Sequence, residues 1–326
     1  MILAGDLGGT HTRLAIFPPE PSAAAALASA HFASVDYPDF AALLDAFRAR
    51  HPGLALTHCA LAVAGPVFDG RCHTTNLPWH LDAREIADTL ALNPDAVALL
   101  NDVEAAALGL PAVPAERFAI LQRGNPGACG NRALIAPGTG LGEAILYWDG
   151  TGHHAFPTEG GHSDFAPRDE LEVALLYHTA RRFPAHVSVE RLISGPGIAL
   201  IHDFLCTRAD GLPAWMPPPG TDAGAAISAR ALARNDPHCT QALALYAALL
   251  GAEAGNLALK AMAVGGVIIA GGIAPKILPI LADGVLLENF LAKGRFRELL
   301  QRIPLTICLD ERAPLLGALR RARAMP

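Results

Sequence analysis

Short apolar runs alternate along the chain with longer stretches in which apolar residues recur at helical spacing. Residues 2–4 and 14–17 are two such runs, and the Gly-rich segment between them predicts a tight turn that joins neighbouring strands. Over residues 40–50 the apolar positions lie three and four apart, which predicts an amphipathic helix. The chain therefore opens with a hairpin and then a helix.

The rest of the first half interleaves strands with helices. Apolar runs predict strands over residues 54–63 and 96–100, and residues 71–79 predict a further strand that ends in a Thr-Asn-Leu-Pro-Trp turn. Helical spacing predicts a helix over residues 81–92, with Asp82 as its N-cap. This order of elements is typical of an α/β domain.

The second half repeats the opening pattern. Apolar residues 133–135 and 144–147 enclose a Gly-Thr-rich turn at residues 138–142, again predicting strand, turn and strand. Two such hairpins predict a duplicated α/β unit with a ligand cleft between the copies. Beyond this hairpin the pattern predicts helices over 168–181 and 240–262, a buried strand over 267–270, and a final helix after Pro314.

The composition is that of a folded globular protein, with 52% hydrophobic and 17% charged residues among 326. This length allows two domains. The net charge of −6 and the dispersed basic residues argue against a nucleic-acid surface. The six cysteines form no C-x-x-C pair, so we interpret them as reduced thiols rather than as disulfides or a zinc site. We find no signal segment or membrane span and expect a soluble, cytoplasmic protein.

The Gly-rich turn at residues 5–10 is the first candidate ligand site. It lacks the Lys of a Walker loop, and no helix follows it as in a Rossmann turn. Its backbone N–H groups can approach a polyphosphate, Asp6 can hold a metal ion, and Thr10 with Arg13 can bond phosphate oxygens. The same pattern also fits an ordinary hairpin with a polar tip.

Two further segments follow predicted strands. Asn101 and Asp102 end one strand, where Asp102 would either accept a proton from a substrate hydroxyl or cap the next helix. Gly271 and Gly272 follow another strand, where they would let an adenine or ribose lie close to the backbone, or form a strand-to-helix turn.

Two polar segments in the second half carry other candidates. Glu159 and His162 are separated by two glycines, and their side chains match the vicinal hydroxyls of a sugar, or lie in a solvated turn. A metal site is less suitable there, because no third ligand is close in sequence. Glu190 is either a further hydroxyl acceptor or the surface partner of Arg191.

Several motifs over nearly the whole chain resemble those of the bacterial glucokinase family. In chain order they are GDLGGTHTRLAIF (5–17), LAVAGPV (61–67), TNLPW (75–79), ND (101–102), PGTGLG (137–142), EGGHSDFAP (159–167), VERLISGPG (189–197) and IAGGIAPK (269–276). The resemblance implies a two-domain α/β fold of the hexokinase-like and actin-like (ribonuclease H-like) type, with an interdomain cleft. We expect a small domain of residues 1–112 with 303–326 and a large domain of residues 113–302.

The resemblance also implies a glucokinase that uses ATP and Mg²⁺ to convert glucose to glucose 6-phosphate. Asp102 would be the catalytic base, and Asp6 would hold Mg²⁺ through water. The residues expected to contact glucose are Asn101, Asp102, Glu159, His162 and Glu190. Those expected to contact the nucleotide are Gly5, Asp6, Leu7, Gly8, Gly9, Thr10, Gly138, Thr139, Gly140, Gly142, Gly271 and Gly272.

The alternatives to a glucokinase are a kinase of another hexose (mannose, fructose or an N-acetylated amino sugar) and a catalytically silent sugar-sensing regulator. The Cys-rich zinc motif of the related repressor/kinase (ROK) branch is missing, which favours the zinc-free branch. Glu143 departs from the family pattern and is expected to place a negative charge near the phosphates. We expect glucose and ATP as partners, no nucleic acid or membrane, and a homodimer.

Overall fold

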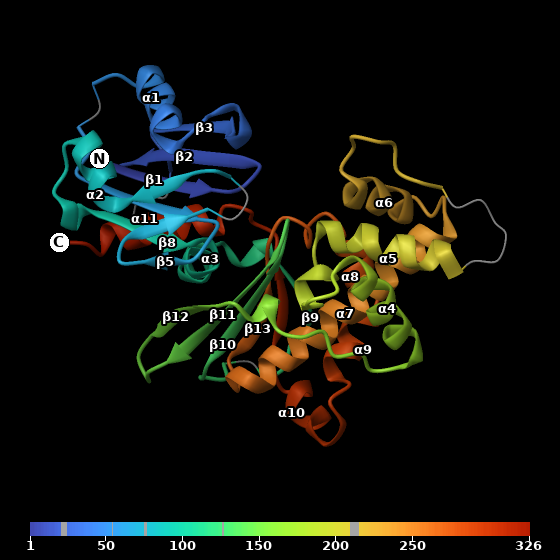
Figure 1. Cartoon of the computed structure of the whole chain (residues 1–326). Coiled ribbons are helices and arrows are strands. Elements are labelled where there is room, and N and C mark those ends of the chain that lie inside the picture. Colours follow the sequence, from blue (N-terminus) through green and yellow to red (C-terminus); the bar gives the residue numbers. More distant parts are fainter. Residues whose placement is uncertain (21–24, 54, 75–76, 126, 209–214) are drawn as a thin grey trace. The chain divides into compact units, whose positions relative to one another are not determined.

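The computed structural model describes residues 1–20, 25–53, 55–74, 77–125, 127–208 and 215–326. This part of the chain divides into two compact units (Figure 1). Unit 1 comprises Met1–Ala115 with Arg312–Pro326, and unit 2 comprises Glu116–Glu311.

Unit 1 is built on a five-stranded sheet of order β3-β2-β1-β4-β8. Its strands are β1 (Ile2–Leu7), β2 (His11–Phe17), β3 (Ala28–Ala33), β4 (His58–Val63) and β8 (Val97–Asn101). β1 pairs antiparallel with β2 and parallel with β4, so the predicted opening hairpin is confirmed. A small three-stranded sheet of the same unit contains β5 (Val67–Phe68), β6 (Arg71–His73) and β7 (His80–Asp82).

Helices cover both faces of the five-stranded sheet. The helices of unit 1 are α1 (Phe40–Arg50), α2 (Ala83–Leu90), α3 (Asp102–Gly109) and α11 (Ala313–Arg323). α1 and α2 pack with Leu3, Leu7 and Leu14 on one face, whereas α11 and Ala105 pack with Ile2 and Ala4 on the other. The predicted helices over 40–50 and 81–92 are confirmed, the second with Asp82 as N-cap.

Unit 2 is built on a six-stranded sheet of order β12-β11-β10-β13-β14-β9. Its strands are β9 (Phe118–Gln122), β10 (Arg132–Pro137), β11 (Leu141–Trp148), β12 (His153–Thr158), β13 (Gly266–Ile269) and β14 (Leu305–Cys308). The first five strands of this order repeat the topology of unit 1, with a hairpin of β10 and β11 and parallel pairs on the other side. The predicted duplication is confirmed.

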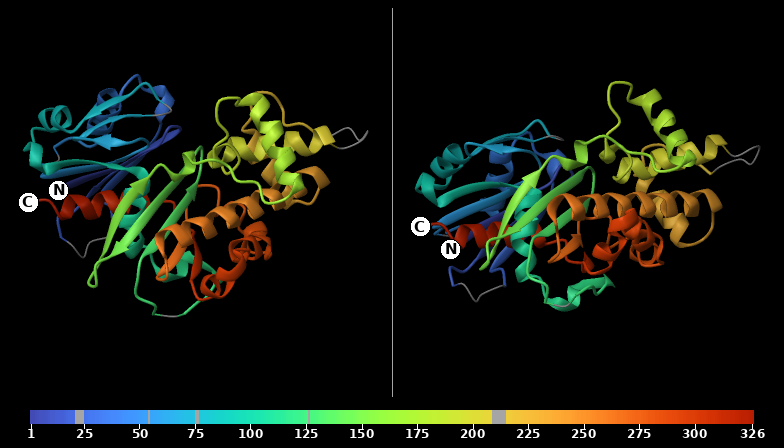
Figure 2. Two further views of the ribbon diagram at one scale, coloured as in Figure 1. Left: turned by 60° about the horizontal axis from the view of Figure 1, so that its bottom comes forward. Right: turned by 90° about the horizontal axis from the view of Figure 1, so that it is seen from below.

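The helices of unit 2 are α4 (Glu170–Arg182), α5 (Gly195–Arg208), α6 (Ala223–Leu232), α7 (Pro237–Ala261), α8 (Leu278–Leu281), α9 (Val285–Leu291) and α10 (Arg297–Gln301). The long helix α7 runs along the sheet, shown in orange in Figure 2. It is long and apolar enough to cross a membrane, but 72% of its most apolar window is buried inside the protein. α7 is therefore a core helix of unit 2.

The division into units differs from the expected domains at the second boundary. Residues 303–311 were expected in the small domain but belong to unit 2, because β14 lies between β13 and β9 in its sheet. The Pro-rich segment around residues 213–219 lies partly outside the described residues.

Candidate functional site

The turn between β1 and β2 in unit 1 is fixed by a residue that sequence reasoning missed. The Ser34 hydroxyl donates to the Gly8 carbonyl at 2.8 Å, and the Ser34 backbone N–H donates to the Thr10 carbonyl at 3.0 Å. Two residues of the expected nucleotide site have packing roles: Leu7 is buried in the core, and a Cβ at Gly5 would lie 2.5 Å from the Leu61 side chain. The backbone that can meet a ligand is therefore the segment from Gly8 to Thr10.

Two charged residues lie next to this turn. Asp6 on β1 stands opposite Arg13 on β2 in the antiparallel ladder. The Nε and Nη1 atoms of Arg13 are buried and have no hydrogen-bond partner among the described residues. Since buried donors of this kind are normally satisfied, Arg13 fits an anionic ligand that reaches the turn.

Asn101 and Asp102 lie at the junction of β8 and α3. Asn101, not Asp102, is the N-cap: its Oδ1 accepts from the backbone N–H groups of Val103 at 3.0 Å and Glu104 at 3.3 Å. Its Nδ2 donates to the Gly65 carbonyl at 3.1 Å, which ties the loop after β4 to this junction. The alternative that Asp102 is the helix cap is therefore wrong. Asp102 is the first helical residue, half-buried, with Oδ1 accepting from the Val103 N–H at 2.9 Å.

In unit 2, the turn between β10 and β11 meets two other Gly-rich segments. The Gly195 N–H at the start of α5 donates to the Gly138 carbonyl at 2.9 Å. Gly271, after β13, has a φ of +80°, and a Cβ there would lie 2.4 Å from the Pro137 carbonyl oxygen. A Cβ at Gly138 or at Gly272 would meet nothing within 4 Å. Open space thus remains beside the half-buried backbone of Gly138 and Gly272, as close approach of a ligand requires.

Glu190 lies against the same turn. Its Oε2 accepts from the Leu141 N–H at 2.9 Å, and a Cβ at Gly140 would lie 2.5 Å from that oxygen. Its neighbour Arg191 instead stacks on the Phe183 ring, with 4.1 Å from guanidinium carbon to ring centroid. Among the described residues no ion pair joins Glu190 to Arg191, so the alternative of Glu190 as the surface partner of Arg191 has no support.

Glu159 is the N-cap of a short 3₁₀ helix, η5 (Gly160–His162), and His162 is its last residue. Both side chains are exposed, and Glu159 Oε2 lies 4.0 Å from His162 Nε2. The two glycines between them allow close approach to β11, since a Cβ at Gly161 would lie 2.2 Å from the Leu141 carbonyl oxygen. A backbone bond from the Val189 N–H to the Ser163 carbonyl, at 3.0 Å, joins this loop to the segment of Glu190. Unit 2 therefore brings Glu159, His162 and Glu190 onto neighbouring segments.

Comparison with known proteins decides the family. The sequence profile of the glucokinase family matches residues 3–325. The chain belongs to the glucokinase family. A glucokinase of Nostoc sp. is 39% identical over 338 residues, which cover 98% of this chain and 97% of the relative.

Solved structures agree with this family and with the predicted fold. The glucokinase from an Antarctic psychrotroph is 29% identical, with a TM-score of 0.81 and 98% of each chain covered. The glucokinase from Balamuthia mandrillaris in complex with glucose is 21% identical, with a TM-score of 0.84, covering 99% of this chain and 93% of that one. The predicted family and the hexokinase-like, actin-like fold are confirmed.

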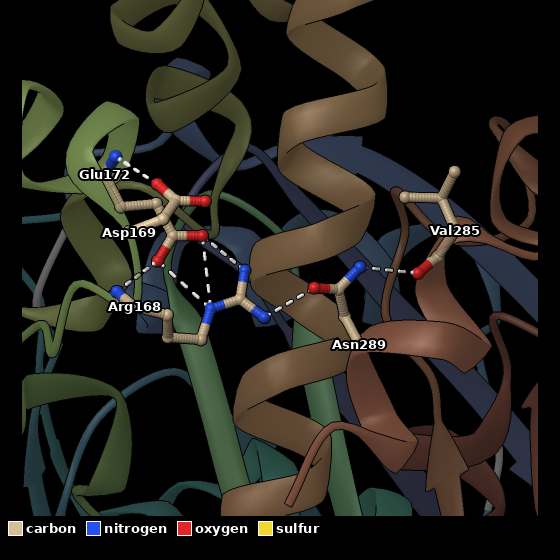
Figure 3. Close-up of polar contacts among 5 residues, drawn as sticks. All are labelled: Arg168, Asp169, Glu172, Val285 and Asn289. Atoms are coloured by element: carbon tan, nitrogen blue, oxygen red, sulfur yellow. Dashed lines mark hydrogen bonds and ion pairs between the residues drawn. The ribbon is translucent and has the colours of Figure 1, made fainter.

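In this member of the glucokinase family, Arg168 anchors the segment that follows Glu159 and His162 (Figure 3). Its guanidinium pairs with the buried Glu172 of α4, and its Nη1 donates to Asn289 Oδ1 of α9 at 2.6 Å. Asn289 Nδ2 in turn donates to the Val285 carbonyl at 2.8 Å. Sequence reasoning missed this anchor, because Asn289 lies 121 residues after Arg168 along the chain.

The Glu143 carboxyl does not lie near the proposed phosphate turn, where it is expected from the sequence. Its side chain is 1% exposed, and a Cβ at Gly160 would lie 2.1 Å from its Oε2. The carboxyl is therefore packed under the loop of Glu159 and His162 rather than in the phosphate turn. Burial, together with the negative charge of Glu253, raises the pKa of Glu143 to about 7, although Lys260 opposes the shift.

Proposed function

We propose that this chain transfers the γ-phosphoryl group of ATP to the 6-hydroxyl of glucose. The hydroxyl oxygen forms the new bond to phosphorus, the bond from phosphorus to ADP breaks, and Asp102 takes the hydroxyl proton. Membership of the glucokinase family and the two Gly-rich turns support this assignment. The expected homodimer stays a prediction.

The sugar contacts proposed for unit 1 divide between two side chains. Asn101 has already committed Oδ1 and one N–H to the protein, so it fixes the junction of β8 and α3 and offers its second N–H to the sugar. Asp102 follows on the first turn of α3, where its carboxylate accepts the proton. Asn101 is thus both a ligand and the support of the base.

In unit 2, the proposed sugar ligands are Glu159, His162 and Glu190. Carboxylate oxygens accept hydrogen bonds from hydroxyls, and the imidazole can donate or accept. The exposed pair of Glu159 and His162, 4.0 Å apart, suits two neighbouring hydroxyls.

The residues of both turns fit a polyphosphate. The orphaned nitrogens of Arg13 supply positive charge, and Gly138 with Gly272 leaves room for a ligand near the backbone. Asp6 offers the hard oxygen ligand that Mg²⁺ prefers, directly or through water. When bound, Mg²⁺ would neutralise charge on the phosphates.

The hydrogen bond from Leu141 to Glu190 is the observation that carries the proposal, because it joins a proposed hydroxyl acceptor to the proposed phosphate turn. A coupled assay over glucose, mannose, fructose and N-acetylated amino sugars, each with ATP and with ADP, tests it. We expect the highest kcat/KM with glucose and ATP. A higher kcat/KM with another hexose would favour a kinase of that hexose. No turnover with any sugar would favour a catalytically silent sugar-sensing regulator.

Truncating Glu159 and Glu190 in turn should separate a role in glucose binding from a role in ATP binding. Removing one partner of a hydrogen bond that the bound sugar buries costs on the order of 1–3 kcal/mol, so Glu159→Ala and Glu190→Ala should each weaken glucose binding by about tenfold or more. Only Glu190→Ala should also weaken ATP binding, because it releases Leu141 in the turn. Calorimetry with each substrate measures this, with the exposed Glu170→Ala as control. Native glucose affinity in both variants would contradict the assignment.

Substituting alanine for either of two glycines in the unit 2 turn should affect substrate binding in different ways. Gly138→Ala adds a Cβ in open space, so it should weaken ATP binding and leave glucose affinity unchanged. Gly140→Ala places its Cβ 2.5 Å from Glu190 Oε2, so it should displace Glu190 and weaken both. Titration of each folded variant with each substrate distinguishes them. Unchanged ATP affinity in Gly138→Ala would show that this turn does not hold the phosphates.

A further inference from the structure

A cluster of metal-ligating side chains lies in unit 2 between α5 and the first turn of α7. One ligand atom each from His202, Asp236 and Cys239 lie within 4.8 Å of one another. Cys206, one helical turn after His202, has its Sγ 3.6 Å from His202 Nε2. None of these residues takes part in the sugar or nucleotide sites proposed above.

The spacing of these four residues along the sequence suits the binding of one metal ion. His202 and Cys206 stand four apart on α5, and Asp236 and Cys239 stand three apart at the start of α7, so each pair lies on one helical face. Two such ligand pairs on separate elements are typical of structural zinc sites.

The side chains of the cluster are also as buried as those of a typical structural metal site. His202 is 1% exposed, and Cys239 is fully buried within the apolar core of unit 2. Cys206 and Asp236 are half-buried, which leaves a path for an ion to enter. The Trp215 ring lies 6.4 Å from the His202 ring, and the Arg230 guanidinium stacks on Trp215 at 4.3 Å.

Asp236 already has one structural role. Its Oδ1 accepts from the backbone N–H groups of His238 at 2.9 Å and Cys239 at 3.0 Å, which makes it the N-cap of α7. A carboxylate has a second oxygen, so capping and metal ligation are compatible. The cap holds the carboxylate in place beside the Cys239 thiol.

We propose that His202, Cys206, Asp236 and Cys239 bind one Zn²⁺ ion. Imidazole, thiolate and carboxylate are the ligands that zinc prefers, and four protein ligands leave no open position, as in structural sites. Binding releases the thiol protons to solvent. The ion would join α5, whose first residue bonds Gly138, to the core helix α7. The sequence-based interpretation of these cysteines as plain thiols would then be wrong.

The test begins with the intact wild-type chain. We expect about one Zn²⁺ per chain by elemental analysis after growth and purification without chelator. After replacement of zinc by Co²⁺, we expect a thiolate-to-cobalt charge-transfer band and the d–d bands of a tetrahedral site. A wild-type protein that binds no zinc and gives no thiolate band with Co²⁺ overturns the proposal without any variant.

Three variants distinguish this site from adventitious binding. Cys206→Ser should lower the charge-transfer intensity by about half, in proportion to the lost thiolate. Asp236→Asn keeps the N-cap, because Asn caps as well as Asp, but should weaken metal binding. Cys129→Ser, at an exposed thiol of unit 2, should change nothing. Equal metal binding in all three variants would overturn the proposal.

Discussion

An Asp102→Asn variant should fold, bind glucose and lose between about 10²- and 10⁴-fold in kcat, the usual contribution of general-base assistance. The amide oxygen of Asn can still accept from the Val103 N–H, as Asp102 Oδ1 does at 2.9 Å. The N-cap of α3 is Asn101, which the substitution leaves in place. Asn cannot take the hydroxyl proton, so the loss should fall on kcat rather than on KM for glucose.

The matched control for this variant is Asp39→Asn. Asp39 caps α1 in the same unit, accepts from the Ala42 N–H at 2.8 Å, and has no role in the proposed site. It should retain full activity. If a folded Asp102→Asn protein keeps kcat within about threefold, well short of the general-base range, Asp102 is not the base. Glu159 and Glu190 would then be the next candidates.

The elements best predicted from the sequence are those whose periodicity or turn chemistry is local. The spacing of Phe40, Leu43, Leu44 and Phe47 predicted α1, and all four side chains are buried. Both Gly-rich hairpins were predicted, because apolar runs flank their turns. α5 was missed because it begins Gly-Pro-Gly, which is more typical of a turn. β14 has only four residues, and its membership of the unit 2 sheet depends on parallel pairing with β13, which no local pattern reveals.

The candidate site, like the fold, could be predicted where its pattern is local and not where it depends on distant partners. The residue types of each half could be predicted from motifs, but their hydrogen bonds could not, because partners such as Leu141 and Glu190 are 49 residues apart. The roles of individual glycines also needed the structure. Gly5 packs against Leu61, whereas Gly161 lets η5 approach β11. The ligand pairs of α5 and α7 are recognisable only once both segments are known to be helical.

Glu143 should make the stability of the protein fall as the pH rises to neutrality. Its carboxyl is 1% exposed, its Oε1 has no hydrogen-bond partner among the described residues, and the nearby Glu253 adds negative charge. Lys260, 3.4 Å from Glu253, offsets this charge only in part. These surroundings raise the pKa of Glu143 from 4.5 to about 7 in the folded protein.

The sign of the effect follows from proton linkage. Between pH 4.5 and 7 the folded protein holds this proton and the unfolded chain does not, so the stability that the proton contributes is complete below pH 4.5. It is lost as the pH rises through about 7, the folded pKa. At about 1.4 kcal/mol for each pH unit of difference in pKa, the loss is about 3 kcal/mol.

A Glu143→Gln variant removes this ionisation and isolates its effect. We expect the free energy of unfolding of the variant, relative to wild type, to rise by about 3 kcal/mol between acidic and mildly alkaline pH. Urea titrations of both proteins across this range measure the difference, and any constant cost of the new amide cancels. The exposed Glu170→Gln serves as the matched substitution. Because Gly160 contacts the Glu143 carboxyl and precedes His162, glucose affinity of the wild type should also weaken above pH 7, and that of Glu143→Gln should not. Parallel stability curves for wild type and Glu143→Gln would show that the buried carboxyl does not ionise near neutrality.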